Sequence, residues 1–340
     1  MFDSKERISF FVYYSKAIAI VLVLMAHCCI WNLDSQIGKS ISLFCKNLGT
    51  LGVAIFFVVS GFLFNRSRSL NYSLGRFFVA KIKRICIPWF CSALVFFAYI
   101  FFRNDVDLKN ILLNAVGYKS FYWYLTITLY LYFIYFLVFK LPYKNLFVVF
   151  LGLISLYYPI CSFLNISPII DFQINPIRWF YFFSAGVIFS EFSSRIHFNK
   201  YNSLFLIGGG VFNSLFFIVF FVALWYKGIA LNYKSFLYLP IASFSVIFFF
   251  CIAYLLTEKK HLGMLEKIGK YSFGIYLYQM FPWTGLLVFL ANKLNFPFLI
   301  VLNPFICLFV CVIEFDVILK ILKSIKKEKY VPYILGIPEK

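Results

Sequence analysis

The sequence predicts an all-α polytopic membrane protein with about ten transmembrane helices and with both termini in the cytoplasm. Three observations support this fold class: an apolar composition, ten long apolar runs, and an uneven distribution of Lys and Arg between alternate loops. Of the 340 residues, 63% are hydrophobic and 13% are charged, whereas a soluble globular domain is about a quarter charged. One soluble core of this length cannot bury 48 Phe and 24 Tyr residues, so soluble classes are excluded.

The predicted spans follow from the length of each apolar run, because a helix needs about 20 apolar residues to cross the hydrocarbon core. Runs of this kind, bounded by basic or turn residues, lie near residues 10–31, 47–65, 85–102, 121–139, 145–164, 174–190, 202–224, 235–256, 271–291 and 296–319. Arg178 interrupts the sixth run. The tenth run carries Glu314 and Asp316 near its end, where we expect them to pair with Lys320.

The net charge of +19 could indicate nucleic acid, anionic lipid or an anionic cofactor as a partner, and its distribution favours a topological origin. Of the 32 Lys and Arg residues, 22 fall in loops on the side of the termini. Nine fall in the opposite loops or, in the case of Arg178, in the span that follows one, and Lys16 lies within the first span. Because cytoplasmic loops are enriched in Lys and Arg, both termini are predicted to be cytoplasmic. We therefore expect membrane lipid, and no nucleic acid, among the partners.

The chain is interpreted as one membrane domain, residues 1–340. The opening Lys5, Arg7 and apolar run resemble a signal peptide, but no convincing small-x-small cleavage site follows and the apolar run is long. No predicted loop exceeds about 20 residues, and neither a repeat of fixed period nor a low-complexity tail is evident.

Two ionisable residues of the first span, Lys16 and His27, are the first candidates for chemistry, because such groups are costly at membrane depth. Their separation of eleven residues turns a helix by about 1,100°, so both side chains lie on one stripe, roughly 16 Å apart along the axis. A neutral histidine in this position suits removal of a proton from a hydroxyl group. The alternative is that Lys16 snorkels to the headgroups and His27 sits at the outer interface.

Other polar candidates have simpler explanations. His197 and His261 fall in predicted cytoplasmic loops beside basic residues, and we interpret them as solvated. The nine cysteines form no C-x-x-C pair and lie mostly in apolar runs, so we expect neither disulfides nor a metal site. Cys28 and Cys29 adjoin His27, but helix neighbours point about 100° apart, which disfavours an acyl-cysteine.

The densest basic cluster is the predicted cytoplasmic segment from Arg66 to Arg84, which could hold the phosphates of a nucleotide-like donor such as coenzyme A. Ordinary positive-inside topology and attraction to anionic lipid would also explain this cluster. In the second span, Ser60 and Gly61 are small residues that permit close helix packing, which is their expected role.

Five segments of the chain, taken together, resemble the membrane acyltransferase-3 family, whose members move acyl groups onto glycans and other hydroxyl-bearing acceptors. SKAIAIVLVLMAH at 15–27 is similar to the family's basic residue, ten spacers and histidine, with Lys16 where Arg is commoner. The others are GVAIFFVVSGFLF at 52–64, FVAKIKRICIP at 78–88, WYLTITLYLYF at 123–133 and IGKYSFGIYLYQ at 268–279. They occur in the family's order, from near residue 10 to near residue 290.

The resemblance implies a roughly ten-helix fold, acyl-CoA as donor and His27 as catalytic base. It implies that Lys16, Lys81 and Arg84 are cations of the donor site or of the structure. It also draws attention to residues of the motifs that bind substrate or serve packing, namely Ser60, Trp123, Ser272 and Tyr276. Gln279 stands where many relatives have histidine, and Thr128 where some have an acidic residue, so a second acid or base is not assigned.

We therefore expect a bacterial inner-membrane O-acyltransferase, foremost an acetyl-CoA-dependent O-acetyltransferase acting on a sugar of O-antigen, capsule or exopolysaccharide. The resemblance is to the shorter branch of the family without an appended soluble domain, which assigns acceptor binding to the membrane domain. A transporter or flippase of a lipid-linked glycan is the alternative, disfavoured because Lys16 and Arg178 are the only obvious cations in the spans. A polysaccharide polymerase is also disfavoured, because it would be expected to have a large periplasmic loop and the sequence predicts none. The sequence leaves homo-oligomer formation open.

Overall fold

The computed structural model describes residues 4–28, 36–101, 113, 117–118, 120–169, 174–195, 200–258, 262–279, 289, 293–294 and 299–337. Every regular element within these ranges is a helix, and they contain no strand, which confirms the predicted all-α class. Cys29, His197 and His261 lie outside the described residues.

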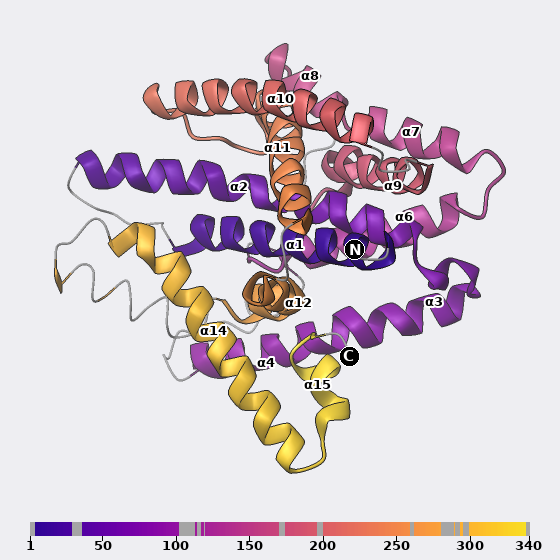
Figure 1. Ribbon diagram of the computed structural model, residues 1–340, viewed down its shortest axis with the longest axis vertical. Coiled ribbons are helices and arrows are strands. Elements are labelled where there is room, and N and C mark those ends of the chain that lie inside the picture. The colour runs from indigo at the N-terminus through magenta and orange to yellow at the C-terminus, as the bar shows by residue number, and fades with distance from the viewer. Residues whose placement is uncertain are drawn as a thin grey trace.

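The α-helices of the described residues follow the chain in the order shown in Figure 1. Their bounds are α1 Ser4–Cys28, α2 Gln36–Asn65, α3 Leu74–Lys81, α4 Ile87–Phe101, α6 Trp123–Val138, α7 Lys144–Ile154, α8 Tyr157–Phe163, α9 Phe180–Arg195, α10 Lys200–Tyr226, α11 Tyr238–Glu258, α12 Gly263–Tyr278 and α14 Leu299–Ser324. A π-helical segment, Ile82–Cys86, joins α3 to α4, and the short helix α15 spans Val331–Ile334.

Each predicted span overlaps at least one of these helices, but the helices differ in their capacity to cross a membrane. Among the described residues, four segments are long and apolar enough: Glu6–Cys28, Gln36–Asn65, Lys144–Phe163 and Tyr238–Thr257. Trp123–Val138 and Gly210–Tyr226 are shorter apolar helices. The chain therefore has the helices of a membrane protein, whereas ten crossings and cytoplasmic termini stay predictions.

Three helices begin earlier than the apolar runs suggest. Helix α1 begins at Ser4 and not near residue 10, α2 begins at Gln36 and not near residue 47, and α12 begins at Gly263 and not near residue 271. The first turns of α2 carry an exposed Lys39, and α12 carries Lys267, which forms a salt bridge with Asp316 of α14. Charged residues that are solvated or paired do not end a helix, so a search for charge-free runs misses these turns. The salt bridge also corrects the expected pairing of Asp316 with Lys320.

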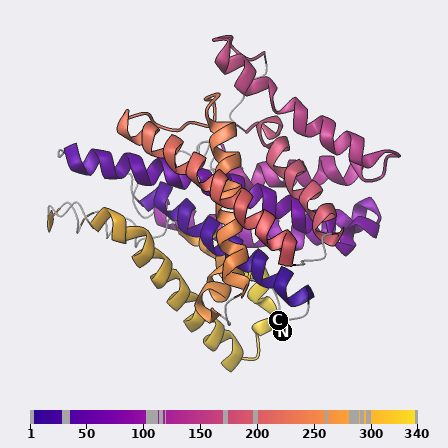
Figure 2. The same ribbon diagram turned by 45° about the horizontal axis from the view of Figure 1, so that its top comes forward.

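Helix α1 lies at the centre of the packing, against α2, α11, α12 and α14 (Figure 1). Ala17, Ala19, Ile20 and Leu24 of α1 are fully shielded from solvent. Helix α14 runs along one side of the molecule, and α7 and α8 lie on the opposite side (Figure 2). The candidate residues of the first span therefore lie on a helix that other helices surround.

Glycines allow the closest of these helix contacts. A Cβ atom at Gly269 of α12 would lie 2.0 Å from the carbonyl oxygen of Tyr13 in α1, and a Cβ atom at Gly61 of α2 would lie 2.1 Å from the carbonyl oxygen of Phe183 in α9. Neither distance leaves room for a side chain, so these glycines fix the approach of the helices. For Gly61, the structure agrees with the expected packing role.

Candidate functional site

Helix α1 positions both candidates of the first span. Lys16 and His27 lie in one uninterrupted helix, and both side chains are partly buried. An unbroken helix keeps residues eleven positions apart on one stripe, separated by roughly 16 Å along the axis. The two side chains therefore lie at different depths along the same face of α1.

His27 lies where the end of α1 meets α12 and α14. Cys307 of α14 is within electrostatic range of the imidazole. The Nδ2 of Asn303 donates a hydrogen bond to the carbonyl oxygen of Cys28 over 2.8 Å, and the thiol of Cys307 donates to the carbonyl oxygen of Gln279 over 3.6 Å. These bonds hold the ends of α1 and α12 against the same turn of α14.

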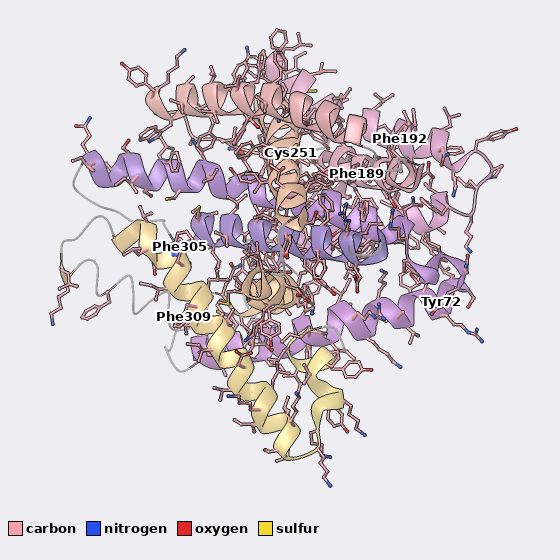
Figure 3. All side chains as sticks on the ribbon, viewed as in Figure 1. Tyr72, Phe189, Phe192, Cys251, Phe305 and Phe309 are labelled. Carbon is pink, nitrogen blue, oxygen red and sulfur yellow. The ribbon has the colours of Figure 1, made fainter. Side chains whose placement is uncertain are left out.

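Helix α14 presents two different faces at this junction. Asn303 and Cys307, one turn apart, are 2% and 1% exposed, whereas Phe305 and Phe309, labelled in Figure 3, are 45% and 57% exposed. The amide and the thiol are thus on the protein-facing side, and the aromatic rings are on the outer side. A mostly apolar helix thereby supplies an amide and a thiol near the end of α1 that carries His27.

A second group of candidate residues surrounds Lys81 of the basic segment, between α3 and α6. The Nζ of Lys81 lies 3.8 Å from the ring centre of Tyr132 and 5.2 Å from that of Phe77, close enough for cation–π attraction. Burial, and to a lesser extent the charge of Arg84, lowers the pKa of Lys81 to about 8. The side chain of Arg84 itself is exposed.

A cavity of about 120 Å³ adjoins Lys81. Its walls are otherwise mostly apolar and come from α3, the π-helical segment and α6: Phe77, Phe78, Ile82, Cys86, Leu129, Tyr132 and Phe133. An ammonium group at the wall of an apolar cavity can bind an anionic group while the walls accommodate an apolar one.

The aromatic and hydroxyl side chains of the sequence motifs connect the helices. The hydroxyl groups of Ser60 and Tyr124 lie 3.3 Å apart, and Tyr132 also interacts with Ser60. The ring centres of Tyr124 and Tyr276 are 5.4 Å apart. Contacts therefore run from Lys81 through Tyr132, Ser60 and Tyr124 to Tyr276, one turn before Gln279 at the end of α12.

The remaining motif residues have packing contacts. The hydroxyl of Ser272 donates to the carbonyl oxygen of Gly269 in its own helix over 2.9 Å, and the hydroxyl of Tyr276 donates to the carbonyl oxygen of Phe121. Trp123 opens α6, with its ring centre 5.3 Å from that of Trp179. Thr128 donates to the carbonyl oxygen of Tyr124 over 2.7 Å.

The structure brings the predicted residues together in two groups and adds residues that sequence reasoning missed. Asn303 and Cys307 join His27, and Tyr132 joins Lys81. In the sequence, Asn303 could have been noticed as a lone amide side chain inside the apolar run 296–319. In the part of the chain that the structure describes, no group of three or more His, Cys, Asp or Glu side chains could hold a metal ion.

One comparison with known proteins gives a match. The model of a protein family described as an acyltransferase domain matches residues 11–315. Neither a curated protein nor a solved structure matches the chain. The matched region includes the junction around His27 and the segment around Lys81.

Proposed function

The chain belongs to the acyltransferase-3 family and is a membrane acyltransferase, and from this premise we propose that it transfers an acetyl group from acetyl-CoA to a sugar hydroxyl. The proposed acceptor is a bacterial surface polysaccharide such as O-antigen, capsule or exopolysaccharide, and the proposed location is the inner membrane. Acetyl-CoA acts as a donor substrate and not as a resident cofactor.

The position of His27 carries this proposal. The imidazole lies at a junction of three helices, beside Cys307, and the neighbouring amides of Gln279 and Asn303 are uncharged. A neutral imidazole beside uncharged amides can accept a proton from a hydroxyl. Such a site suits transfer between two uncharged reacting groups, a hydroxyl and a thioester.

The reaction balances with His27 as the only acid or base. His27 removes the proton from the acceptor hydroxyl while that oxygen attacks the carbonyl carbon of the thioester. The C–O bond forms, the C–S bond breaks, and the coenzyme A thiolate leaves. The proton on His27 then passes to this thiolate, which restores the neutral imidazole.

The donor is proposed to enter at the basic segment. Lys81 and Arg84 would attract its phosphates, and the cavity beside Lys81 offers apolar walls. The contacts from Lys81 to Tyr276 run in the direction of Gln279 and the His27 junction. Lys16 lies on the same stripe as His27 and supplies a further cation along this surface.

We expect His27→Ala to lower acetyl transfer by about 10²–10⁴-fold, the usual contribution of a general base. The measurement is the O-acetyl content of purified surface polysaccharide, by NMR before and after mild alkali, in a deletion strain that expresses wild type or variant. His197→Ala and His261→Ala are matched controls and should retain activity, because both are predicted to lie in loops.

The outcomes separate the proposal from its alternative. An ester signal that is lost in the deletion strain, returns with wild type and stays absent with folded His27→Ala supports acyl transfer through His27. An unchanged ester signal, together with less or shorter surface polysaccharide in the deletion strain, contradicts it and indicates a transporter or flippase.

A further inference from the structure

Two buried amide side chains near His27 have hydrogen-bonding atoms without a partner in the part of the chain that the structure describes. Gln279 is 1% exposed, and neither its Oε1 nor its Nε2 has a hydrogen-bond partner among the described residues. Asn303 is 2% exposed; its Nδ2 donates to Cys28, but its Oδ1 is unpartnered within the same ranges. Because buried polar groups are normally hydrogen-bonded, such atoms need an explanation.

Other buried amides of the chain show the usual behaviour. The Nδ2 of Asn47 donates to the carbonyl oxygen of Ile229 over 2.9 Å, and its Oδ1 accepts from the backbone N–H of Leu231 over 2.7 Å. The Nδ2 of Asn213 donates to the carbonyl oxygen of Phe244 over 2.7 Å. The unpartnered atoms therefore reflect the place of Gln279 and Asn303 in the fold and not a general shortage of partners.

That place is the junction at the end of α1. Asn303 is bonded to Cys28, the residue that follows His27. Gln279 is bonded through its carbonyl oxygen to Cys307, which is within electrostatic range of His27. The two amides thus belong to the same small neighbourhood as the proposed base. A group bound to them would lie at the same end of α1 as His27.

The three unpartnered atoms specify the chemistry of that group. Gln279 Oε1 and Asn303 Oδ1 can only accept hydrogen bonds, and Gln279 Nε2 can only donate. The opposite orientation of the Gln279 amide, with Oε1 and Nε2 exchanged, would offer the same donor and acceptor, because neither atom has a partner among the described residues. A hydroxyl group can donate to Oε1 and accept from Nε2, and a second hydroxyl can donate to Oδ1. A thioester carbonyl has no hydrogen to donate, so it fits this set poorly.

We propose that Gln279 and Asn303 form the acceptor site, in which they bind two neighbouring hydroxyl groups of an uncharged polyhydroxylated acceptor and present one of them to His27. This inference rests on the proposed function and adds two residues that bind the acceptor. The amides orient the acceptor and take no part in proton transfer. Their unsatisfied burial is a cost to stability that the acceptor removes when it binds.

The test uses the full-length protein in liposomes, with acetyl-CoA and, as acceptor probe, the unacetylated surface polysaccharide purified from the deletion strain. Gln279→Met keeps the size of the side chain and removes both hydrogen-bonding atoms. We expect the KM for the polysaccharide to rise at least tenfold and the KM for acetyl-CoA to stay within twofold. Gln279→Asn keeps both kinds of atom and should recover part of the loss.

Thermal unfolding of the same samples distinguishes a role of Gln279 in acceptor binding from a role in stabilising the fold. Removal of an unpartnered amide should leave the Tm of Gln279→Met equal to that of wild type or raise it. Asn47→Leu is the matched control: it removes two satisfied hydrogen bonds, so its Tm should fall.

Each contrary result has a separate meaning. An unchanged polysaccharide KM in Gln279→Met, with active wild type, overturns the acceptor site and leaves the proposed function intact. A Tm of Gln279→Met that falls as far as that of Asn47→Leu overturns it also, because the amide would then be structural. Failure of wild type to acetylate the polysaccharide contradicts the proposed function itself.

Discussion

Lys16 carries a charge inside the first candidate span, on the helix that the other helices surround. A charged group at that depth is costly and is retained where it has a function. We expect Lys16→Ala to lower the rate of acetyl transfer at least about tenfold, the loss of one charge-assisted interaction. Lys16→Arg should retain part of the rate, because the charge remains while the shape changes.

Assays of both variants in liposomes, with thermal unfolding as a check of folding, measure this expectation. A wild-type rate in folded Lys16→Ala would assign Lys16 to snorkelling alone. Equal losses in both variants would indicate a requirement for an ammonium group specifically.

Lys81 should give the proposed donor site a pH dependence. Its pKa is lowered to about 8 by burial and by Arg84, so its ammonium is charged below that pH and becomes neutral as the pH rises through it. A neutral amine does not attract phosphate, so the KM for acetyl-CoA should increase above pH 8 by up to about tenfold.

Lys81→Arg provides the matched control for this profile. Arginine stays protonated throughout the accessible range, so the KM of the variant should lose this dependence between pH 7 and pH 9. Identical pH profiles for wild type and Lys81→Arg would show that Lys81 does not bind the donor.

At the scale of single residues, the sequence predicted the candidates that a local pattern identifies and missed those that only the fold brings close. Lys16 and His27 share one helix, and their spacing was sufficient to place them on one stripe. Asn303 is 276 positions from His27 along the chain, and its bond to Cys28 depends on the path of α14 past α1. No spacing rule connects residues so far apart.

At the scale of helices, the motif glycines have a packing explanation. Gly269 brings α12 against Tyr13 of α1, so α12 approaches the helix that carries Lys16 and His27. Its partner in the motif, Ser272, donates a hydrogen bond back to the carbonyl oxygen of Gly269. The glycine of the G-x-x-S pattern thus allows the close approach of two helices.

We expect Gly269→Ala to destabilise the fold by about 1–3 kcal/mol, the usual cost of overpacking. The added Cβ atom would meet the carbonyl oxygen of Tyr13 at 2.0 Å, which forces α12 away from α1. Gly263→Ala, at the first position of the same helix, is the control, because nothing lies within 4 Å of its Cβ position. Thermal unfolding in detergent compares the two, and equal Tm values would contradict the packing role.

The existence of the helices was easier to predict than their ends. Apolar runs located a helix in each predicted span because burial in lipid or protein requires an apolar surface. The ends depend on groups outside those runs, such as Lys267 of α12, whose partner Asp316 lies on α14. A tertiary ion pair allows a helix to continue through charged residues, and the sequence alone does not reveal that pair.

At the scale of the whole molecule, the arrangement of charge predicts how the protein lies in the membrane. The segment from Arg66 to Arg84 and the end of α14 are rich in Lys and Arg, whereas the connection between α10 and α11 carries only Lys227 and Lys234. Positive loops are retained in the cytoplasm. The basic segment with Lys81 should therefore face the compartment that contains acetyl-CoA.

Single cysteines test this topology, because a membrane-impermeant thiol reagent labels only the accessible side of intact cells. Arg76, Lys234 and Lys326 are exposed positions in three different connections or ends. We expect Lys234→Cys to be labelled in intact spheroplasts, and Arg76→Cys and Lys326→Cys to be labelled only after permeabilisation. Wild type, with its native cysteines, gives the background. Labelling of Arg76→Cys in intact spheroplasts would place the basic segment outside and would remove Lys81 and Arg84 from any contact with a cytoplasmic donor.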